Sequence, residues 1–533
     1  NSIGNTFNED AVLTLRPETI LSVVGDVQQT SASSTIVEID ALDTTASLVA
    51  DGSIERHGSL SITNSSGSLS GAVLGNTIPL MQATSLINEF GSVMFPTMPA
   101  GFGLQLVQSS SPGGSPTLVS MQVIAVEGAE FEAPVDATLP GPPVDVQSLD
   151  IDNDGKDEIA YLLDGSPGMV VVYSVTGDGN APVLIQGLQV NVGNNPVDLD
   201  VADLNGDGND DLLVANASGT TLNVLLVDDG RSTEHSFNVL TIDLSSNDPS
   251  LLTCAAIIDW DGDSDLDAVV GVDVIDESIE DRYEVVLDIA TNSPTSGPSF
   301  NVPMYQIGNE DFADTPTCVA GAHGTNGVNV IAWGFVGGTS YGHLHRTDPA
   351  STRATLEEMA SLEGNKVTSI EVRDLDANGG DGLVDILASS GDAKSAYLLQ
   401  GEIGRATGFG ELIPLNVGDV ITDIIAIDAD RDGDMDFLIA TPDSATSLQL
   451  LRNDGSGSAG ARMAPLEGNS FNRQDVITNN PVSRITSGGL SGKDDLDDWT
   501  GGGNENSGPL FNGTLGSMDQ VNIIPPDPPS CAG

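Results

Sequence analysis

The chain has 533 residues, of which 39% are hydrophobic and 61 are glycines, enough to bury a core in several domains or in one large repeat array. Its 78 acidic residues face only 17 Lys and Arg, giving a formal net charge of −61 at pH 7. So acidic a chain repels phosphate backbones and anionic headgroups, which excludes nucleic acid and bare membrane surfaces as natural partners and favours cations. The sequence contains no run of 18 apolar residues and so predicts no membrane span.

Residues 1–128 are rich in Ser, Thr and Gly and contain alternating stretches such as STIVEID, GSLSIT, FGLQLV and LVSMQVIAV. A period of two is typical of β-strands with one buried face. We therefore expect a β-sandwich-like domain of seven or eight strands. The first residue is Asn1 rather than methionine, which suits a mature exported chain, so we expect an extracellular or cell-surface location.

An Asp-rich segment recurs through residues 129–524. Its clear copies start 53, 56, 115 and 54 residues apart, at Asp150, Asp203, Asp259, Asp374 and Asp428. Each copy follows an alternating stretch such as VDLDVADL and precedes a short apolar run such as IAYLL or LLVA. The interval of 115 residues contains a copy without acids at 317–334, and a seventh copy at Ser487 lacks the first three acids.

Seven copies, each with about four strand-like runs, predict a seven-bladed β-propeller with four-stranded blades over residues 129–524. Residues 131–139 read as an additional strand that can pair into the last blade and close the ring, which removes an open sheet edge. Residues 525–533 form a proline-rich tail, a composition that favours an extended polyproline II conformation.

The Asp-rich loops and their flanking strands resemble the FG-GAP/VCBS repeat family, the calcium-binding blades of integrin α-subunit heads and of many secreted bacterial proteins. The resemblance covers roughly residues 130–524 and rests on five loops. It implies a seven-bladed propeller with calcium in its blade loops, and it implies no particular activity.

Calcium takes six to eight oxygen ligands, and in these loops the side chains at positions 1, 3 and 5 converge while position 9 closes the cage. The expected ligands, loop by loop, are Asp150, Asp152, Asp154 and Glu158; Asp203, Asn205, Asp207 and Asp211; Asp259, Asp261, Asp263 and Asp267; Asp374, Asp376, Asn378 and Asp385; and Asp428, Asp430, Asp432 and Asp436. Ser264 replaces the glycine of the third loop, and an insertion in the fifth moves the closing acid to Asp381 or Asp385. The competing interpretation is a self-capping Asx turn. Converging carboxylates repel without a cation, which favours about five structural calcium sites.

The segment Tyr341, His343, His345 and Arg346 is the one chemically rich cluster in the sequence. His343 and His345 share one strand face, which suits a transition metal or acid–base chemistry, although two surface histidines without a function fit as well. Cys254 and Cys318 occupy equivalent places in adjacent blades. Free buried thiols are the default expectation for this pair, and a disulfide is the alternative.

Two functions from different classes fit the sequence. The favoured one is a non-enzymatic extracellular subunit for adhesion, for a cell surface or for a fibre, with a protein partner or self-association and glycans as further candidate ligands. The alternative is a polysaccharide-acting lyase or hydrolase with a site on blade four. An aromatic content of 4% and the negative charge speak against the enzyme, because sugar sites use aromatic platforms and uronates are anionic.

Overall fold

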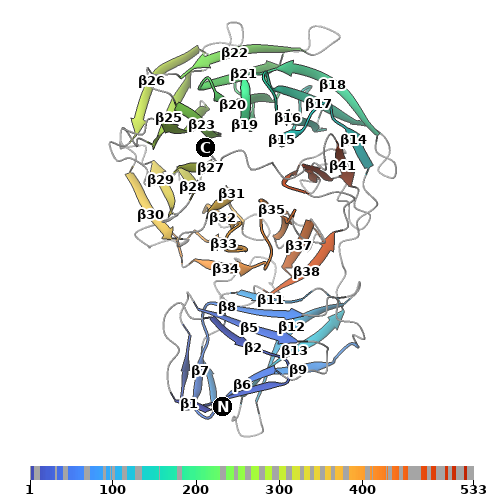
Figure 1. The fold of residues 1–533 in the computed structure, drawn as a ribbon, viewed down its shortest axis with the longest axis vertical. Helices are drawn as coiled ribbons and strands as arrows, with labels where there is room; N and C mark the ends of the chain where they lie inside the picture. The colour runs from blue at the N-terminus through green and yellow to red at the C-terminus, as the bar shows by residue number, and fades with distance from the viewer. Residues whose placement is uncertain are drawn as a thin grey trace.

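The structure of the chain is a computed structural model. It describes residues 2–4, 12–29, 33–39, 46–64, 73–87, 90, 92–96, 98, 102–110, 117–125, 135–154, 156–176, 183–227, 236–244, 250–258, 266–274, 282–290, 299–307, 315–323, 329–336, 341–347, 355–361, 366–375, 383–401, 409–410, 412–427, 429, 435–442, 448–453, 470–476, 482–487, 499–501, 507–511 and 521–524. All named elements in these residues are β-strands, arranged as an N-terminal unit beneath a ring of sheets (Figure 1). No helix in the described part of the chain is long and apolar enough to cross a membrane.

The N-terminal unit is a parallel β-helix, in which successive turns of the chain add strands to three sheets. One sheet contains β1 (Ser2–Gly4), β3 (Thr19–Val24), β6 (Ala46–Ala50) and β9 (Thr77–Ala83), and a second contains β2 (Val12–Leu15), β5 (Ser34–Ile39), β8 (Ser59–Asn64) and β11 (Ser92–Met94). The third contains β4 (Val27–Gln28), β7 (Ser53–Glu55) and β10 (Ser85–Ile87). Neighbouring strands within these sets run parallel.

This pairing shows that the predicted β-sandwich is wrong, because a sandwich of that kind is built from antiparallel sheets. Among the described strands of this unit, antiparallel pairing is confined to β12 (Phe102–Ser110) with β13 (Thr117–Ala125) and β13 with β9. Alternation of apolar residues reports that a strand has one buried face, and it carries no information about strand direction. The prediction therefore found strands and assigned them to the wrong architecture.

Apolar side chains stack in register through the interior of the β-helix. Val27, Ile54 and Leu86 occupy matching positions on three successive turns, and Leu48 lies between Leu21 and Met81 in the neighbouring sheet. Ile54 and Leu48 are fully buried in the core that these columns form. Because each residue packs on its equivalent one turn away, the repeated alternation buries one continuous apolar column.

Six four-stranded antiparallel units follow in chain order. Their strands are β15 (Pro143–Leu149), β16 (Glu158–Leu163), β17 (Met169–Thr176) and β18 (Val183–Asn191); β19 (Asn194–Ala202), β20 (Asp211–Ser218), β21 (Thr221–Val227) and β22 (Phe237–Asp243); β23 (Ser250–Ile258), β24 (Asp267–Val274), β25 (Arg282–Ala290) and β26 (Ser299–Ile307); β27 (Pro316–His323), β28 (Asn329–Phe335), β29 (Tyr341–Thr347) and β30 (Thr355–Ser361); β31 (Val367–Arg373), β32 (Asp385–Ser390), β33 (Ser395–Leu399) and β34 (Ile413–Asn416); and β35 (Asp423–Ile427), β36 (Asp436–Ala440), β37 (Leu448–Asn453) and β38 (Ser470–Val476).

A further sheet completes the ring within the described residues. It contains β39 (Arg484–Ser487), β40 (Trp499–Gly501), β41 (Ser507–Phe511), β42 (Val521–Ile524) and the early strand β14 (Val135–Thr138). β14 pairs antiparallel with β41, which confirms the predicted closure of the ring by a strand from residues 131–139. The sheets surround an axis lined by the first strand of each unit (Figure 1).

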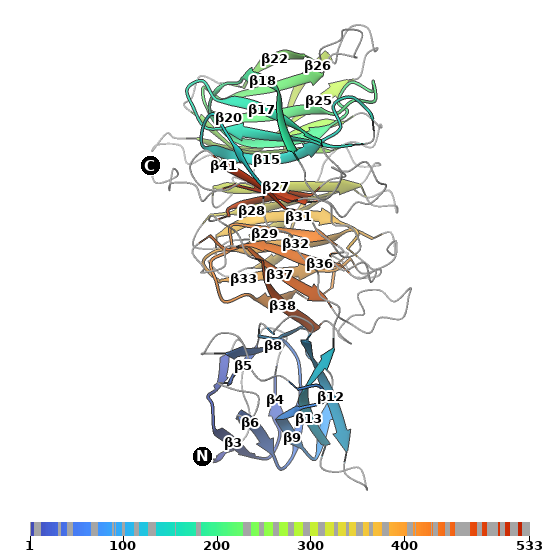
Figure 2. The ribbon, with the colours of Figure 1, turned by 90° about the vertical axis from the view of Figure 1, so that its right-hand side faces the viewer.

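The β-helix and the ring share one continuous sheet. β11 pairs in parallel with β38, the outermost strand of the sixth unit, so that eight strands run from β2 to β35. Asn472 on β38 reinforces the joint. Its amide accepts a hydrogen bond from the N–H of Leu104 at 2.9 Å and donates one to the carbonyl of Leu104 at 3.2 Å. The two units therefore form an elongated molecule with the ring standing on the β-helix (Figure 2).

Candidate metal centre

Each Asp-rich loop is the hairpin turn between the first and second strands of its unit. The closing acid of each loop is the first residue of the second strand, namely Glu158 of β16, Asp211 of β20, Asp267 of β24, Asp385 of β32 and Asp436 of β36. All five side chains are buried, with exposed fractions of 8% or less. The loop thus begins at a strand end, crosses the rim of the sheet and returns with a buried carboxyl group.

In the first loop, three carboxyl groups converge. Oxygens of Asp150, Asp152 and Glu158 all lie within 4.8 Å of one another. Asp150 also accepts a hydrogen bond from the N–H of Asp154 at 3.2 Å, and Glu158 accepts one from the N–H of Ile151 at 3.3 Å. The backbone N–H groups thus hold the carboxylates in the arrangement that the loop pattern predicts, with oxygen donors only.

In the second loop, Asp203 organises the turn. Its two oxygens accept hydrogen bonds from the N–H groups of Gly206, Asp207 and Gly208 at 2.7, 3.1 and 2.9 Å. Gly206 and Gly208 have φ values of +72° and +93°, a left-handed backbone that favours glycine. These glycines allow the tight turn of the loop. The carboxylate oxygens of Asp203, Asp207 and Asp211 do not all lie within 4.8 Å of one another, unlike the three carboxylates of the first loop.

The second loop contains a buried oxygen without a protein partner. The side-chain oxygen of Asn205, at position 3, is shielded from solvent and has no hydrogen-bond partner among the described residues. A buried polar atom of this kind costs about 1–3 kcal/mol unless something bonds to it. A hard cation bound by Asn205 and its carboxylate neighbours would satisfy it, so the donor set fits calcium.

Burial shifts the closing acids toward the neutral form when no cation is bound. It raises the pKa of Asp211 to about 8, with the carboxylates of Asp207 and Asp203 adding to the rise and the N–H donors of Val227 and Leu204 opposing it. Burial likewise raises the pKa of Glu158 to about 8. A divalent cation would reverse this effect, because an opposite charge favours the ionised carboxylate.

The remaining loops are described in part. Asp267, Asp374, Asp385 and Asp436 are placed, whereas Asp259, Asp261, Asp263, Asp376, Asn378, Asp428, Asp430 and Asp432 lie outside the described residues. Asp385 accepts hydrogen bonds from Leu375 and Gly401, the same arrangement that Asp211 makes with Leu204 and Val227. Asp385 therefore occupies the closing position of the fifth loop, and the alternative, Asp381, lies outside the described residues.

The closing acids have a second task that the sequence analysis missed. One oxygen accepts the N–H of loop position 2, and the other accepts an N–H from the end of the third strand or just beyond it. For Asp211 the second donor is Val227 at 2.8 Å, for Asp385 it is Gly401 at 2.7 Å, and for Asp436 it is Asn453 at 2.8 Å. Asp211, Asp385 and Asp436 thus each tie their loop to the third strand of the same unit.

The loops carry the similarity to known proteins. Residues 150–214, which span the first two loops, match the family model described as the FG-GAP-like repeat. This segment is an FG-GAP-like repeat. A search of curated proteins found no match to the sequence.

Several solved structures align with most of the chain at low similarity. BBS1N in complex with ARL6DN, from a crystal soaked with mercury, is 11% identical, with 74% of this chain and 97% of that chain covered and a TM-score of 0.43. The β-propeller domain of Cps50 (Swd1) from Myceliophteria thermophila is also 11% identical, with 75% and 100% covered and a TM-score of 0.41.

A second feature of the ring is an axial cavity of about 430 Å³, which is lined by the first strands of the units. Five acidic side chains on these strands each accept a hydrogen bond from a backbone N–H on the first strand of the next sheet, at 2.6–3.1 Å. The pairs are Asp145 with Leu199, Asp198 with Ala255, Asp200 with Ile257, Glu371 with Ala426, and Asp423 with Ile485. A first strand is a sheet edge with unpaired N–H groups, and these carboxylates satisfy them from the neighbouring sheet.

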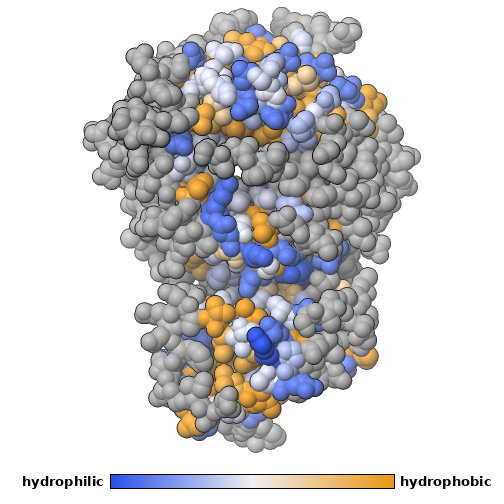
Figure 3. Space-filling view, in the orientation of Figure 1, coloured by the Kyte–Doolittle hydropathy of each residue, from blue (hydrophilic) through white to orange (hydrophobic). Residues whose placement is uncertain are grey.

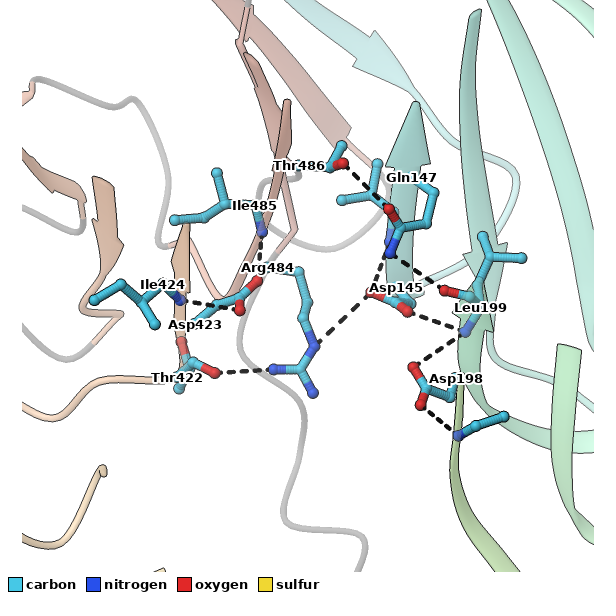
Figure 4. A network of polar contacts seen from close by, with 12 residues as sticks. Asp145, Gln147, Asp198, Leu199, Thr422, Asp423, Ile424, Arg484, Ile485 and Thr486 are labelled. Carbon is cyan, nitrogen blue, oxygen red and sulfur yellow. Dashed lines mark hydrogen bonds and ion pairs between the residues drawn. The ribbon is translucent and has the colours of Figure 1, made fainter. Parts of the chain in front are cut away.

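Arg484 of β39 occupies the point where the ring closes (Figure 4). Its guanidinium donates to the carbonyl of Thr422 in the preceding sheet at 3.0 Å and lies 4.0 Å from the carboxylate of Asp145 in the following one. Burial raises the pKa of Asp145, and Arg484 opposes that rise. The alternating acids of VDLDVADL, which include Asp198 and Asp200, were a signal for this bonding, because acids on the channel face of an inner strand need a partner.

Two other predicted features have different outcomes. Cys254 and Cys318 are free thiols, so the disulfide alternative is wrong. The backbone of β29 places His343 and His345 two residues apart on one strand, and the side chains of Tyr341, His343, His345 and Arg346 lie outside the described residues. The polysaccharide-acting enzyme on blade four stays a hypothesis.

Proposed function

We propose that this chain is a non-enzymatic scaffold whose seven-bladed propeller is held together by structural calcium in its blade loops. The observation that carries the proposal is the donor set of the first two loops. Three carboxylates meet within 4.8 Å in the first, and in the second lies a buried amide oxygen that has no hydrogen-bond partner among the described residues. Oxygen-only sites at the rim of a sheet suit calcium, and the ion would fix the rim rather than act on a substrate.

The proposed location is outside the cell. Calcium modules with dissociation constants of about 10⁻⁴–10⁻³ M are filled where calcium is millimolar, which is the extracellular condition. Filling about five sites would also offset part of the charge of −61 and reduce the repulsion among acids.

The scaffold role is supported by the continuous sheet between the two units. Eight strands run from β2 through β11 and β38 to β35, so a force on the β-helix passes to the ring through backbone hydrogen bonds. Each axial carboxylate that bridges neighbouring sheets is already bonded to backbone N–H groups, which suits a rigid frame better than acid–base catalysis.

We further propose that the first turns of the β-helix meet a second copy of the chain. Val12, Ile20 and Val24 on β2 and β3 are 55–64% exposed, and both strands lack charged residues. Apolar residues also gather on the visible face of this unit (Figure 3). An uncharged patch at the end of an elongated molecule lets two strongly acidic copies meet while their rings stay far apart.

Thermal unfolding with and without a chelator tests the calcium proposal. A cation bound by the native state alone adds about 2.7 kcal/mol per site at a hundredfold excess over its Kd. We therefore expect chelation to lower the melting temperature by many degrees, and calcium to restore it better than magnesium, which requires tighter octahedral geometry. A melting temperature that does not change when a chelator is added would refute the proposal that bound calcium stabilises the propeller.

Sedimentation of the full chain tests the scaffold proposal separately. Replacing Val12, Ile20 and Val24 together by Ser removes the apolar patch and leaves the buried Leu15 and Val23 of the same strands in place. Wild type should sediment as a dimer or larger assembly and the triple variant as a monomer with an unchanged melting curve. A wild type that stays monomeric at high micromolar concentration would refute self-association through this patch.

A further inference from the structure

The first and second Asp-rich loops are in direct contact through Asp210. The carboxylate of Asp210 accepts a hydrogen bond from the N–H of Asp150 at 2.8 Å, and the N–H of Asp210 donates to the carbonyl of Asp150 at 3.0 Å. Both backbone polar groups of Asp150 are therefore bonded to one residue of the neighbouring blade. Asp150 is also the first expected ligand of its own loop, so Asp210 holds the backbone from which that ligand projects.

A second contact joins the same two loops. A Cβ atom placed on Gly208 would lie 2.9 Å from the side-chain nitrogen of Asn153, closer than such atoms approach in folded proteins. Gly208 thus lies against the side chain of Asn153, at the fourth position of the first loop, and its φ of +93° favours glycine there. The loops therefore touch at two points, positions 1 and 4 of the first loop.

We propose that Asp210 is a positioning residue that couples the two loops, so that a cation in the second loop strengthens cation binding in the first. The inference rests on the proposed function, because it requires both loops to bind calcium. A cation held by Asp207 and Asp211 fixes the segment that contains Asp210, and a fixed Asp210 holds Asp150 in its binding position. By linkage, binding in the first loop strengthens binding in the second by the same factor.

The residue at the equivalent position limits this coupling to the first two loops. Position 8 is acidic in the first and second loops (Asp157 and Asp210) and apolar in the third, fifth and sixth (Leu266, Val384 and Met435), while the copy that precedes the first loop in the ring, at Ser487, lacks the first three acids. An apolar side chain has no acceptor for the N–H of the preceding loop's first residue. The third loop therefore lacks the carboxylate link to the second, and the first two loops form a coupled pair.

Electrostatic repulsion between two divalent cations on adjacent loops acts in the opposite direction. It would make the first loop bind more weakly once the second is filled. The sign of the coupling therefore separates the two effects, because hydrogen-bonded positioning predicts tighter binding and repulsion predicts weaker binding.

Hydrogen exchange of the full chain against free calcium measures each loop separately. Peptides covering residues 150–158 and 203–211 report the two loops, and a peptide over β32 reports the fold. In Asp207→Ala we expect the second loop to lose its calcium-dependent protection. The free calcium concentration that gives half-maximal protection of residues 150–158 should then rise at least about fivefold, which is the lower range of allosteric coupling.

Asp210→Leu copies the residue of the third loop and should leave both loops able to bind. We expect its first-loop midpoint to rise as in Asp207→Ala, with no further rise when the two changes are combined. Asp210→Asn keeps an oxygen that can accept the N–H of Asp150, and it should retain most of the coupling.

A first-loop midpoint that is unchanged or lower in Asp207→Ala would overturn the coupling. Asp210→Asn behaving like Asp210→Leu would overturn its hydrogen-bonded basis. If neither peptide of the wild type responds to calcium while β32 stays protected, the calcium function itself fails, and this outcome is distinct from the loss of coupling alone.

Discussion

Replacing Asp211 by Asn should have opposite effects on the stability of the calcium-free and calcium-bound protein. Asp211 is fully buried, and burial raises its pKa from the ordinary 3.8 to about 8. Without a cation, the folded protein therefore keeps this carboxyl group protonated at pH 7, whereas the unfolded chain ionises it. Each pKa unit corresponds to about 1.4 kcal/mol, so the proton uptake costs the folded state ~4 kcal/mol.

Asn has no such cost, and its side-chain oxygen still accepts one of the two N–H groups that Asp211 serves. Losing the acceptor for Leu204 or Val227 costs about 1–3 kcal/mol. The calcium-free variant should therefore be more stable than wild type at pH 7 by ~1–3 kcal/mol. With calcium the order reverses, because the variant loses a ligand and with it about 2.7 kcal/mol of binding stabilisation at a hundredfold excess over Kd.

Urea unfolding at pH 7, in a chelator and in millimolar calcium, measures both effects. Asp207→Asn is the matched control. It makes the same chemical change in the same loop, but the Asp207 carboxylate is less buried and, among the described residues, accepts one hydrogen bond, from the N–H of Asn209. The control should lose the calcium effect without gaining stability in the chelator. If Asp211→Asn is less stable than wild type in the chelator, the carboxylate is a net stabiliser without a cation and the reasoning is refuted.

Three further predictions concern the rest of the molecule. Burial raises the pKa of Asp200 to about 6, so the stabilisation that its protonated carboxyl group gives the folded state is complete below pH 4 and is lost as the pH rises through 6. In a chelator, the melting temperature should therefore fall between pH 4 and pH 6, and less steeply in Asp200→Asn. Burial raises the pKa of Cys254 well above its usual range, and this side chain is only 1% exposed, so a thiol reagent at pH 8 should label it only as fast as the protein unfolds, as mass spectrometry can follow. Asn472→Ala removes both hydrogen bonds to Leu104 and should destabilise the joint between the β-helix and the ring by about 1–3 kcal/mol. In calorimetry the β-helix should then melt at a lower temperature than in wild type. A single transition at the wild-type temperature would contradict the role of this contact.

The sequence by itself determined the strands of the ring and the positions of its loops. Alternating apolar residues and a local Asp pattern are properties of short segments, and such segments fold into a hairpin turn wherever they lie in the chain. Glu158, Asp211, Asp267, Asp385 and Asp436 accordingly start a strand each, as the loop spacing requires. The closing strand β14 was also readable, because an extra strand before the first repeat has one open edge to fill.

Only the tertiary structure decided how these segments meet. Strand direction in residues 1–94 depends on which strands become neighbours, and the same alternation serves parallel and antiparallel pairs, so the β-helix was not visible in the sequence. The bonds of Asp210 to Asp150, of Asp145 to Leu199 and of Asn472 to Leu104 join residues 60, 54 and 368 positions apart. No local pattern encodes such partners, because a buried carboxylate or amide bonds to whichever N–H the packing of distant strands brings within reach.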